Sequence, residues 1–201
     1  MKKIVNALGD QCPLPVVKAT HALQEMTEAG TLEVHVDNAI AVQNLLRMAS
    51  GHKLKASEKQ LNAKEYVVVM EVNGEQAEAA APTAVAEDSK ENMVVAIASE
   101  CLGHGDETLG KTLMKGFIFA LSQLPVLPTT ILFYNGGAKL TVEGSDSLED
   151  LQHMAAAGVN ILTCGTCLNF YGLTEKLAVG EVSNMYTIVE TLVNADKVIK
   201  Q

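Results

Sequence analysis

Between Gly74 and Asn92 the sequence loses the apolar periodicity that runs through the rest of the chain. This segment is rich in alanine and acidic residues and has no repeating apolar face. Segments of this composition bury too little apolar surface to fold and behave as flexible linkers. The sequence therefore predicts a domain at residues 1–73, a flexible linker at 74–92 and a second domain at 93–201, with a short linker helix as the alternative.

The first domain alternates in the order strand, helix, strand, helix, strand, strand. Apolar residues recur at helical spacing over residues 13–29, and Gly30 can stop that helix. A second helix, capped by Asp37 or Asn38, ends at Gly51. Two strands, expected to be antiparallel, complete the domain. The pattern predicts a small two-layer α/β sandwich of the α+β class, with two helices on a four-stranded sheet.

The second domain begins with the continuous apolar run 93–98, which is typical of a buried parallel strand. Further strands at 129–134, 159–163 and 197–199 alternate with helices, and a short helical turn is expected near 168–175. This alternation predicts an α/β domain with a mostly parallel sheet and helices on both faces. The long helix after the first strand is expected to bury one face, made of Leu109, Leu113, Phe117, Ala120 and Leu124. Ser145 or Asp146 is expected to cap the next helix.

A cysteine followed by two prolines, in the sequence Gly9-Asp10-Gln11-Cys12-Pro13-Leu14-Pro15, lies between the first strand and the first helix. The helix is expected to begin at Pro13, so Cys12 falls at or near its N-cap. There the helix dipole and free amides favour a thiolate. Pro13 and Pro15 lack an N–H, so they fix the direction of Cys12 more than they hold its charge. Lys18 either helps to hold a thiolate or persulfide, or is a solvated helix lysine. The alternative for Cys12 is a buried cysteine in a proline turn.

Three further cysteines follow strands of the second domain. Cys101 comes after the first strand, and Cys164 and Cys167 come after the third. In an open α/β sheet the carboxyl ends of the strands form the ligand-binding edge. We therefore expect these thiols on one functional edge, although their mutual contact depends on the strand order.

The pair Cys164-x-x-Cys167 has three interpretations. It is a redox or persulfide-handling pair, since the first thiol of such a motif often has a lowered pKa. It is half of a zinc site completed by Cys101-x-x-His104. Or it is two buried cysteines without a role.

Two glycine-containing loops of the second domain are interpreted as turns. Gly103-His104-Gly105-Asp106 matches neither the dinucleotide nor the Walker phosphate-binding pattern. Asn135-Gly136-Gly137 also reads as a turn. Neither a cofactor nor a bound metal is expected.

Composition excludes several classes of protein. The net charge is −9, aromatic residues make up 4%, and there is no tryptophan, so nucleic-acid binding is not expected. No window approaches the roughly 18 apolar residues of a membrane span, and the N-terminal apolar run is too short for a signal peptide. A cytoplasmic protein is therefore expected. Its four cysteines are then expected to be catalytic, redox-active or metal-binding rather than disulfide-bonded.

The pattern Gly9-x-x-Cys12-Pro13-x-Pro15-x-x-Lys18 resembles that of the TusA (SirA-like) family of small α/β-sandwich sulfur carriers, over residues 2–73. The resemblance implies that Cys12 carries a persulfide in a setting formed by Gly9, Pro13, Pro15 and Lys18. Asn6 stands where this family usually has aspartate, which bears on the local hydrogen bonding.

The second domain resembles the DsrE/DsrF family of sulfur-relay proteins. The resemblance rests on its α/β order, on the run from Cys164 to Leu173, and on residues 180–185. The whole arrangement is similar to the YedF-type sulfurtransferase-like proteins associated with selenium metabolism, in which a TusA-like domain is fused to a DsrE-like one.

These resemblances imply a persulfide carrier or transferase. Sulfur or selenium would pass through Cys12 and then through Cys101, Cys164 and Cys167. The implied partners are a cysteine desulfurase or another donor, and an acceptor protein. A homo-oligomer is also implied. The alternatives are a thiol-redox or zinc-binding module and a non-catalytic adaptor of a sulfur-relay complex.

Overall fold

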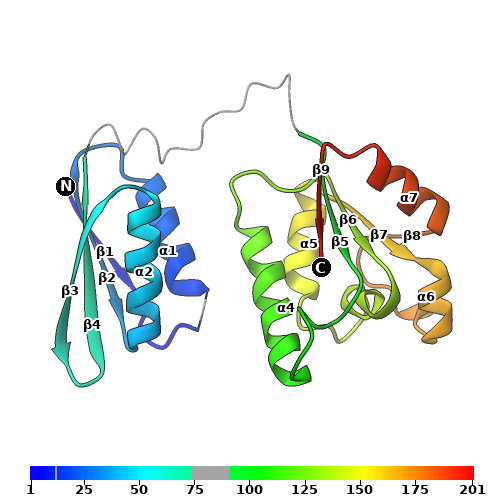
Figure 1. The fold of residues 1–201 in the computed structure, drawn as a ribbon, viewed down its shortest axis with the longest axis horizontal. Helices are drawn as coiled ribbons and strands as arrows, with labels where there is room; N and C mark the ends of the chain where they lie inside the picture. Colours follow the sequence, from blue (N-terminus) through cyan, green and yellow to red (C-terminus); the bar gives the residue numbers. More distant parts are fainter. Residues whose placement is uncertain (12, 74–90) are drawn as a thin grey trace. The chain divides into compact units, whose positions relative to one another are not determined.

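The computed structural model describes residues 1–11, 13–73 and 91–201. The chain divides into two compact units, and the division falls within residues 74–90 (Figure 1). Apart from Glu91 and Asn92, the predicted linker lies outside the described residues, so its flexibility stays a prediction. Asn92 is anchored to the second unit, because its N–H donates to Asp196 Oδ2 at 2.8 Å and its side-chain amide to Asn194 O at 2.9 Å.

The first unit is the predicted sandwich. Its sheet has the order β1-β2-β4-β3, with β1 parallel to β2 and the other neighbouring pairs antiparallel. Both helices cover the same face of this sheet (Figure 1). The elements are β1 (Lys2–Asn6), α1 (Leu14–Gln24), β2 (Gly30–Val36), α2 (Ala39–Gly51), β3 (Lys55–Asn62) and β4 (Glu65–Val72).

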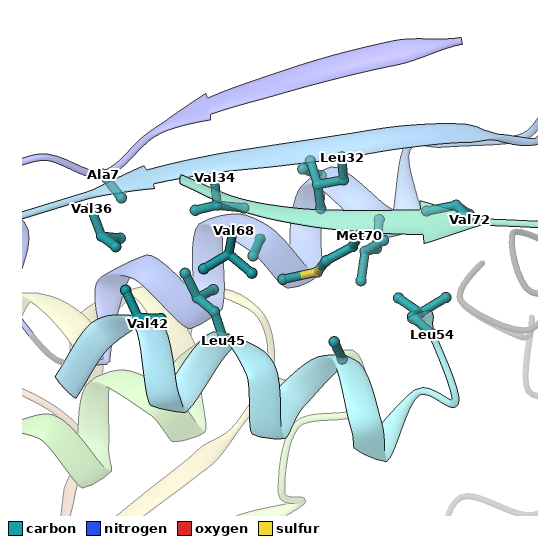
Figure 2. Packing of buried hydrophobic residues seen from close by; sticks show 14 of the residues in the cluster. Ala7, Leu32, Val34, Val36, Val42, Leu45, Leu54, Val68, Met70 and Val72 are labelled. Carbon is teal, nitrogen blue, oxygen red and sulfur yellow. The ribbon is translucent and has the colours of Figure 1, made fainter. Parts of the chain in front are cut away.

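Alternate residues of β2 and β4 form the core under the helices. Figure 2 shows these side chains pointing toward α2, whose Val42 and Leu45 meet them. The period-two alternation thus places one face of each strand in the core. Every residue of β3, the edge strand, is exposed. The buried strand residues are Leu32, Val34, Val36, Val68, Met70 and Val72.

The first helix is shorter than predicted. It ends at Gln24 rather than Ala29, because Met26 N–H donates to Leu23 O at 3.0 Å and the fully buried Met26 turns the chain into the core. Gly30 does not stop a helix but begins β2. A Cβ at this position would lie 2.0 Å from Met1 O, so the close approach of the N-terminus explains the glycine.

The second helix begins where predicted. Asn38 is its N-cap, and its Oδ1 accepts a hydrogen bond from Ala41 N–H at 2.8 Å. This bond satisfies one of the amides that a helix start leaves without an intrahelical partner.

The second unit is the predicted parallel α/β domain. Its five strands run parallel in the order β8-β7-β6-β5-β9. Helices α4 and α5 lie on one side of the sheet, and α6 and α7 lie on the other (Figure 1). The elements are β5 (Met93–Ile97), α4 (Glu107–Ser122), β6 (Thr130–Phe133), η1 (Asn135–Thr141), α5 (Leu148–Ala156), β7 (Asn160–Cys164), α6 (Gly165–Phe170), η2 (Thr174–Lys176), β8 (Glu181–Ser183), α7 (Met185–Val193) and β9 (Lys197–Lys200).

The buried face of α4 differs from the prediction. Leu109 is 56% exposed and Leu113 is 45% exposed, whereas Met114 and Ile118 are fully buried. The helix carries two apolar stripes, and the stripe that faces the sheet contains Gly110. A Cβ at Gly110 would lie 2.8 Å from Cys101 Cβ, so this glycine lets the helix approach the loop after β5.

Two other boundaries after β6 also differ. Helix α5 begins at Leu148 with Ser147 as its N-cap, and no side-chain capping bond forms, so neither Ser145 nor Asp146 is the cap. The short helix expected near residues 168–175 instead begins directly after Cys164, and η2 follows it. Strand β8 was not predicted, because its three residues are too few to show a pattern.

Candidate functional site

The segment around Cys12 is described on both sides of that residue, while Cys12 itself lies outside the described residues. Leu14 N–H donates to Gln11 O at 2.9 Å, and Val16 N–H donates to Pro13 O at 3.0 Å. Pro13 is therefore the N-cap, and α1 begins at Leu14, one residue later than predicted. The amides expected to be free for a charge at Cys12 already bond to carbonyl oxygens.

Lys18 connects the second turn of α1 to the loop before Cys12. Its Nζ donates to Asp10 Oδ2 at 2.5 Å and to Asn6 O at 3.5 Å. The ammonium is thus paired with a carboxylate instead of standing alone in solvent. The Asn6 side chain also has a local role, since its Oδ1 accepts from Leu8 N–H at 3.0 Å. An asparagine therefore supplies the acceptor needed at this position.

Gly9 is held in a left-handed conformation by the start of α2. Its φ is +81°, and its N–H donates to Asp37 Oδ2 at 3.0 Å. Asn38 Nδ2 donates to the other carboxylate oxygen at 2.8 Å. These two bonds, the Asn38 bond first, hold the pKa of Asp37 below its ordinary value. Sequence reasoning considered Asp37 only as a possible helix cap, because a contact across 28 residues leaves no local signal.

Because the Gly9 N–H donates to the Asp37 carboxylate, we expect the NMR resonance of this amide to follow the protonation of Asp37. The midpoint should lie below about 3.9, the ordinary pKa of aspartate. The lowered folded-state pKa means that the contribution of Asp37 to stability is complete above its unfolded pKa. It is lost as the pH falls through the folded value. Heteronuclear NMR of wild type and Asp37→Asn measures this, and the titration should be absent from the variant. A midpoint above that of a free aspartate would contradict the assignment.

A shallow hollow of about 30 Å³ lies beside the prolines of the same loop. It is bounded on one side by the start of α1 and on the other by the start of α2, where Ile40 is 69% exposed. A volume of this size has room for small, water-sized groups next to the residues that flank Cys12. Its lining residues are Asp10, Pro13, Pro15, Val16, Asn38, Ile40, Ala41 and Asn44.

The three cysteines of the second unit follow the carboxyl ends of parallel strands, as predicted. Strand β6 separates β5, which precedes Cys101, from β7, which ends at Cys164. The Cys101 thiol donates to Glu107 O at 3.7 Å and lies against Gly110, so it packs on α4. Cys164 and Cys167 instead pack in the cluster that includes Ile188 of α7. At the carboxyl edge of the sheet, Cys101 therefore lies on the face covered by α4, and Cys164 and Cys167 lie on the opposite face.

Cys164 and Cys167 differ in accessibility. Cys164 is 2% exposed, whereas Cys167 on α6 is half-buried. Asn135 N–H donates to Cys167 Sγ at 3.0 Å. Burial raises the pKa of the Cys167 thiol, its hydrogen bond with Cys164 raises it further, and the Asn135 N–H acts in the opposite direction. Cys167 is thus the member of the pair that a reacting group can reach.

A zinc site is not assembled in the described part of the chain. No three His, Cys, Asp or Glu side chains come together there as a metal-binding group. The proposed set of Cys101, His104, Cys164 and Cys167 is therefore not brought together, and its three cysteines are free thiols. The loop containing His104 is the expected turn, and Asp106 Oδ1 caps α4 by accepting from Leu109 N–H at 2.8 Å.

Sequence reasoning missed the role of Asn135-Gly136-Gly137, which it interpreted as a turn only. These residues begin η1, which lies against the end of β5. A Cβ on Gly137 would meet Ile97 O at 2.2 Å, and this contact requires glycine. The sequence does offer one signal, which is the position of the motif directly after β6. This strand lies between β5, which precedes Cys101, and β7, which ends at Cys164.

No helix in residues 1–11, 13–73 and 91–201 has both the length and the apolar character needed to cross a lipid bilayer.

Comparison with known proteins divides the chain in the same way. A family model described as "Sulfurtransferase TusA" matches residues 3–72, and one described as "DsrE/DsrF-like family" matches residues 82–200, more than half of the chain. A relative from Methanocaldococcus jannaschii, named "Putative sulfur carrier protein", is 42% identical over 52 residues, which are 26% of this chain and 68% of the relative.

Two solved structures are also similar. A SirA-like protein from Desulfitobacterium hafniense is 35% identical, with 36% of this chain and 99% of that chain covered and a TM-score of 0.34. The YchN protein from E. coli is 16% identical, with 56% and 100% covered and a TM-score of 0.45.

Proposed function

Because the chain belongs to the DsrE/DsrF-like family and carries a TusA/SirA-like domain ahead of it, we propose that it is a persulfide carrier in which Cys12 holds the transferred atom. The coarser role, sulfur relay, follows from the two families. The match to the TusA model over residues 3–72, which include Cys12, is the observation that carries the proposal.

Loading of Cys12 is a thiol exchange. The Cys12 thiolate attacks the terminal sulfur of a donor persulfide, the S–S bond of the donor breaks, and the donor leaves as a thiolate. Because the amides of Leu14 and Val16 bond to carbonyl oxygens, the Lys18–Asp10 pair is the charged group available beside this loop. In this proposal the Lys18 ammonium favours the anionic sulfur, and the paired Asp10 carboxylate offsets part of that effect.

Cys167 is the proposed acceptor in the second unit, since it is half-buried and Cys164 is enclosed. Its thiolate attacks the terminal sulfur of the Cys12 persulfide, and Cys12 leaves as a thiolate. Cys164 then attacks Cys167 Sγ, which forms a Cys164–Cys167 disulfide and releases hydrosulfide. A dithiol reductant restores both thiols. The sequence-based interpretation assigned to Cys167 the resolving step that forms the disulfide. The burial of Cys164 favours the opposite order, in which Cys167 accepts the sulfur and Cys164 resolves it.

The partners proposed for this relay are a cysteine desulfurase or another sulfur or selenium donor, and an acceptor protein. A cytoplasmic location fits donors of this kind, and assembly into a homo-oligomer is part of the proposal. Cys101 remains a candidate, but its packing on α4 separates it from the pair on the other face.

We expect Cys12→Ser to abolish sulfur loading of the whole chain by a cysteine desulfurase supplied with cysteine. Intact-mass measurement of wild type and of each single Cys→Ser variant detects the mass of one added sulfur. The increment should persist in the Cys101→Ser variant, which is the matched control for thiol number. An increment that survives Cys12→Ser would sink the proposal, and full cellular function of that variant would favour a non-catalytic adaptor.

A further inference from the structure

Asn135 has a positive φ, which is uncommon for a residue other than glycine. Its φ is +49°, and Lys53 is the other non-glycine residue with positive φ in the described part of the chain. Such residues carry strain and persist where the surrounding structure holds them. In this conformation the Asn135 N–H donates to Cys167 Sγ at 3.0 Å.

The Asn135 side chain is held by Tyr171, which directly follows α6. The Tyr171 hydroxyl donates to Asn135 Oδ1 at 3.2 Å. Lys139 Nζ lies 5.1 Å from the centre of the Tyr171 ring, and its other contact is Glu100 Oε1 at 2.7 Å. A cation over the ring and an ion pair behind that cation restrict the position of the hydroxyl. The conformation of Asn135 is therefore supported from outside the Cys164-x-x-Cys167 motif.

We propose that Asn135 and Tyr171 are positioning residues for Cys167: the Asn135 N–H stabilises negative charge on Cys167 Sγ, and the Tyr171 hydroxyl fixes Asn135 for this task. The inference rests on the proposed function of Cys167 as sulfur acceptor. It assigns a role to two residues that lie outside the cysteine motifs and that the relay scheme does not use.

The hydrogen bond acts in the step in which Cys167 accepts sulfur. In this step Sγ is the attacking thiolate, and its negative charge passes to the departing Cys12 thiolate as the new S–S bond forms. An N–H already aimed at Sγ favours the ionised thiol before the attack, without reorganisation. Because this amide is a backbone N–H, it stays protonated across the pH range in which the thiol titrates.

The charged and titratable groups around Cys167 are consistent with this role. Burial and then Cys164, at the end of β7, raise the pKa of Cys167, and the Asn135 N–H lowers it. Lys139 on η1 and Tyr171 form the next layer, followed by Glu100 in the loop after β5. The Asn135 N–H is thus the nearest group that favours the anion.

We expect Tyr171→Phe to raise the midpoint of the pH–rate profile for alkylation of Cys167 by about half a pH unit, the size of one neutral hydrogen bond. The phenylalanine keeps the ring under Lys139 and removes only the hydroxyl. Iodoacetamide labelling of the full-length chain, followed by peptide mass spectrometry, reports Cys167 separately from the other thiols. Tyr186→Phe is the matched control, because Tyr186 is 76% exposed on α7 and should leave the midpoint unchanged.

Asn135 variants separate the backbone conformation from the side chain. Asn135→Ala disfavours positive φ and should raise the Cys167 midpoint by about one unit. Asn135→Gly adopts this φ freely but still lacks the side-chain oxygen that Tyr171 holds, so it should recover about half of the shift. Equal shifts for the alanine and glycine variants, or an unchanged midpoint in Tyr171→Phe, would overturn the inference. The proposed function would survive either result if Cys167 still received sulfur from a desulfurase through Cys12. If the midpoints move as expected but Cys167 never receives sulfur from Cys12, the positioning role stands and the proposed function fails.

Discussion

Replacing Gly137 by alanine is expected to destabilise the second unit by about 2–3 kcal/mol, in the upper range for overpacking a well-packed site. The new Cβ would lie 2.2 Å from Ile97 O and 2.9 Å from Ile97 C. Ile97 is fully buried at the end of β5, and its carbonyl oxygen already accepts Tyr134 N–H at 3.1 Å. Because strand backbone cannot yield as a flexible side chain can, η1 must move away from the sheet.

Movement of η1 should also affect Cys167, since Asn135 belongs to the same short helix. A displaced Asn135 N–H would no longer reach Cys167 Sγ, so the Gly137→Ala variant should show both lower stability and slower alkylation of this thiol. Urea unfolding of the full-length chain, followed by circular dichroism, measures the free energy of unfolding. Peptide mass spectrometry measures the alkylation rate.

Gly136→Ala is the matched control. A Cβ at Gly136 would meet Ser99 Cα at 3.5 Å, an ordinary van der Waals contact. The free energy of unfolding should therefore change by no more than about 0.5 kcal/mol, as for a surface substitution. If the two neighbouring alanines cost the same, the crowding against Ile97 is not what requires glycine at position 137.

The order of strands and helices in both units could be predicted because each leaves a local signal. The alternation of Leu32, Val34 and Val36 with polar residues is the local signal of a half-buried strand, and the face that these three residues form is buried. Asn38 and Gly51 marked the two ends of α2. The end of α1 has a long-range cause, since it is decided by the burial of Met26, and Gly30 faces the N-terminal residue.

The buried face of α4 shows a different limit of sequence reasoning. Two apolar stripes run along this helix, and periodicity alone does not decide which one faces the sheet. The choice follows from the close contact between Gly110 and Cys101, which belong to separate elements. The same holds for the candidate site. The strand ends placed Cys101, Cys164 and Cys167 on one edge, but the contact of Asn135 with Cys167 depends on how η1 packs across the sheet.

In a chain whose Cys12 has been loaded by a desulfurase, we expect Cys167→Ser to abolish the appearance of sulfur in the second unit. Cys12 should still load in this variant, and its persulfide should accumulate. Cys164→Ala should have the opposite effect, since the buried thiol that resolves the Cys167 persulfide is then missing and the persulfide should build up on Cys167. Trapping with a persulfide-reactive alkylating agent, followed by peptide mass spectrometry, identifies which cysteine carries the sulfur.

Cys101→Ser is the control for this pair of variants, because Cys101 packs against Gly110 and bonds to Glu107 O on the opposite face from Cys167. It should leave the distribution of sulfur unchanged. The burial of Cys164 makes the order of events testable: an enclosed thiol cannot be the first to meet an incoming persulfide, whereas a half-buried one can. Sulfur trapped on Cys164 in the Cys167→Ser variant would therefore show that the second unit opens during transfer, and the assigned order of the two thiols would be wrong.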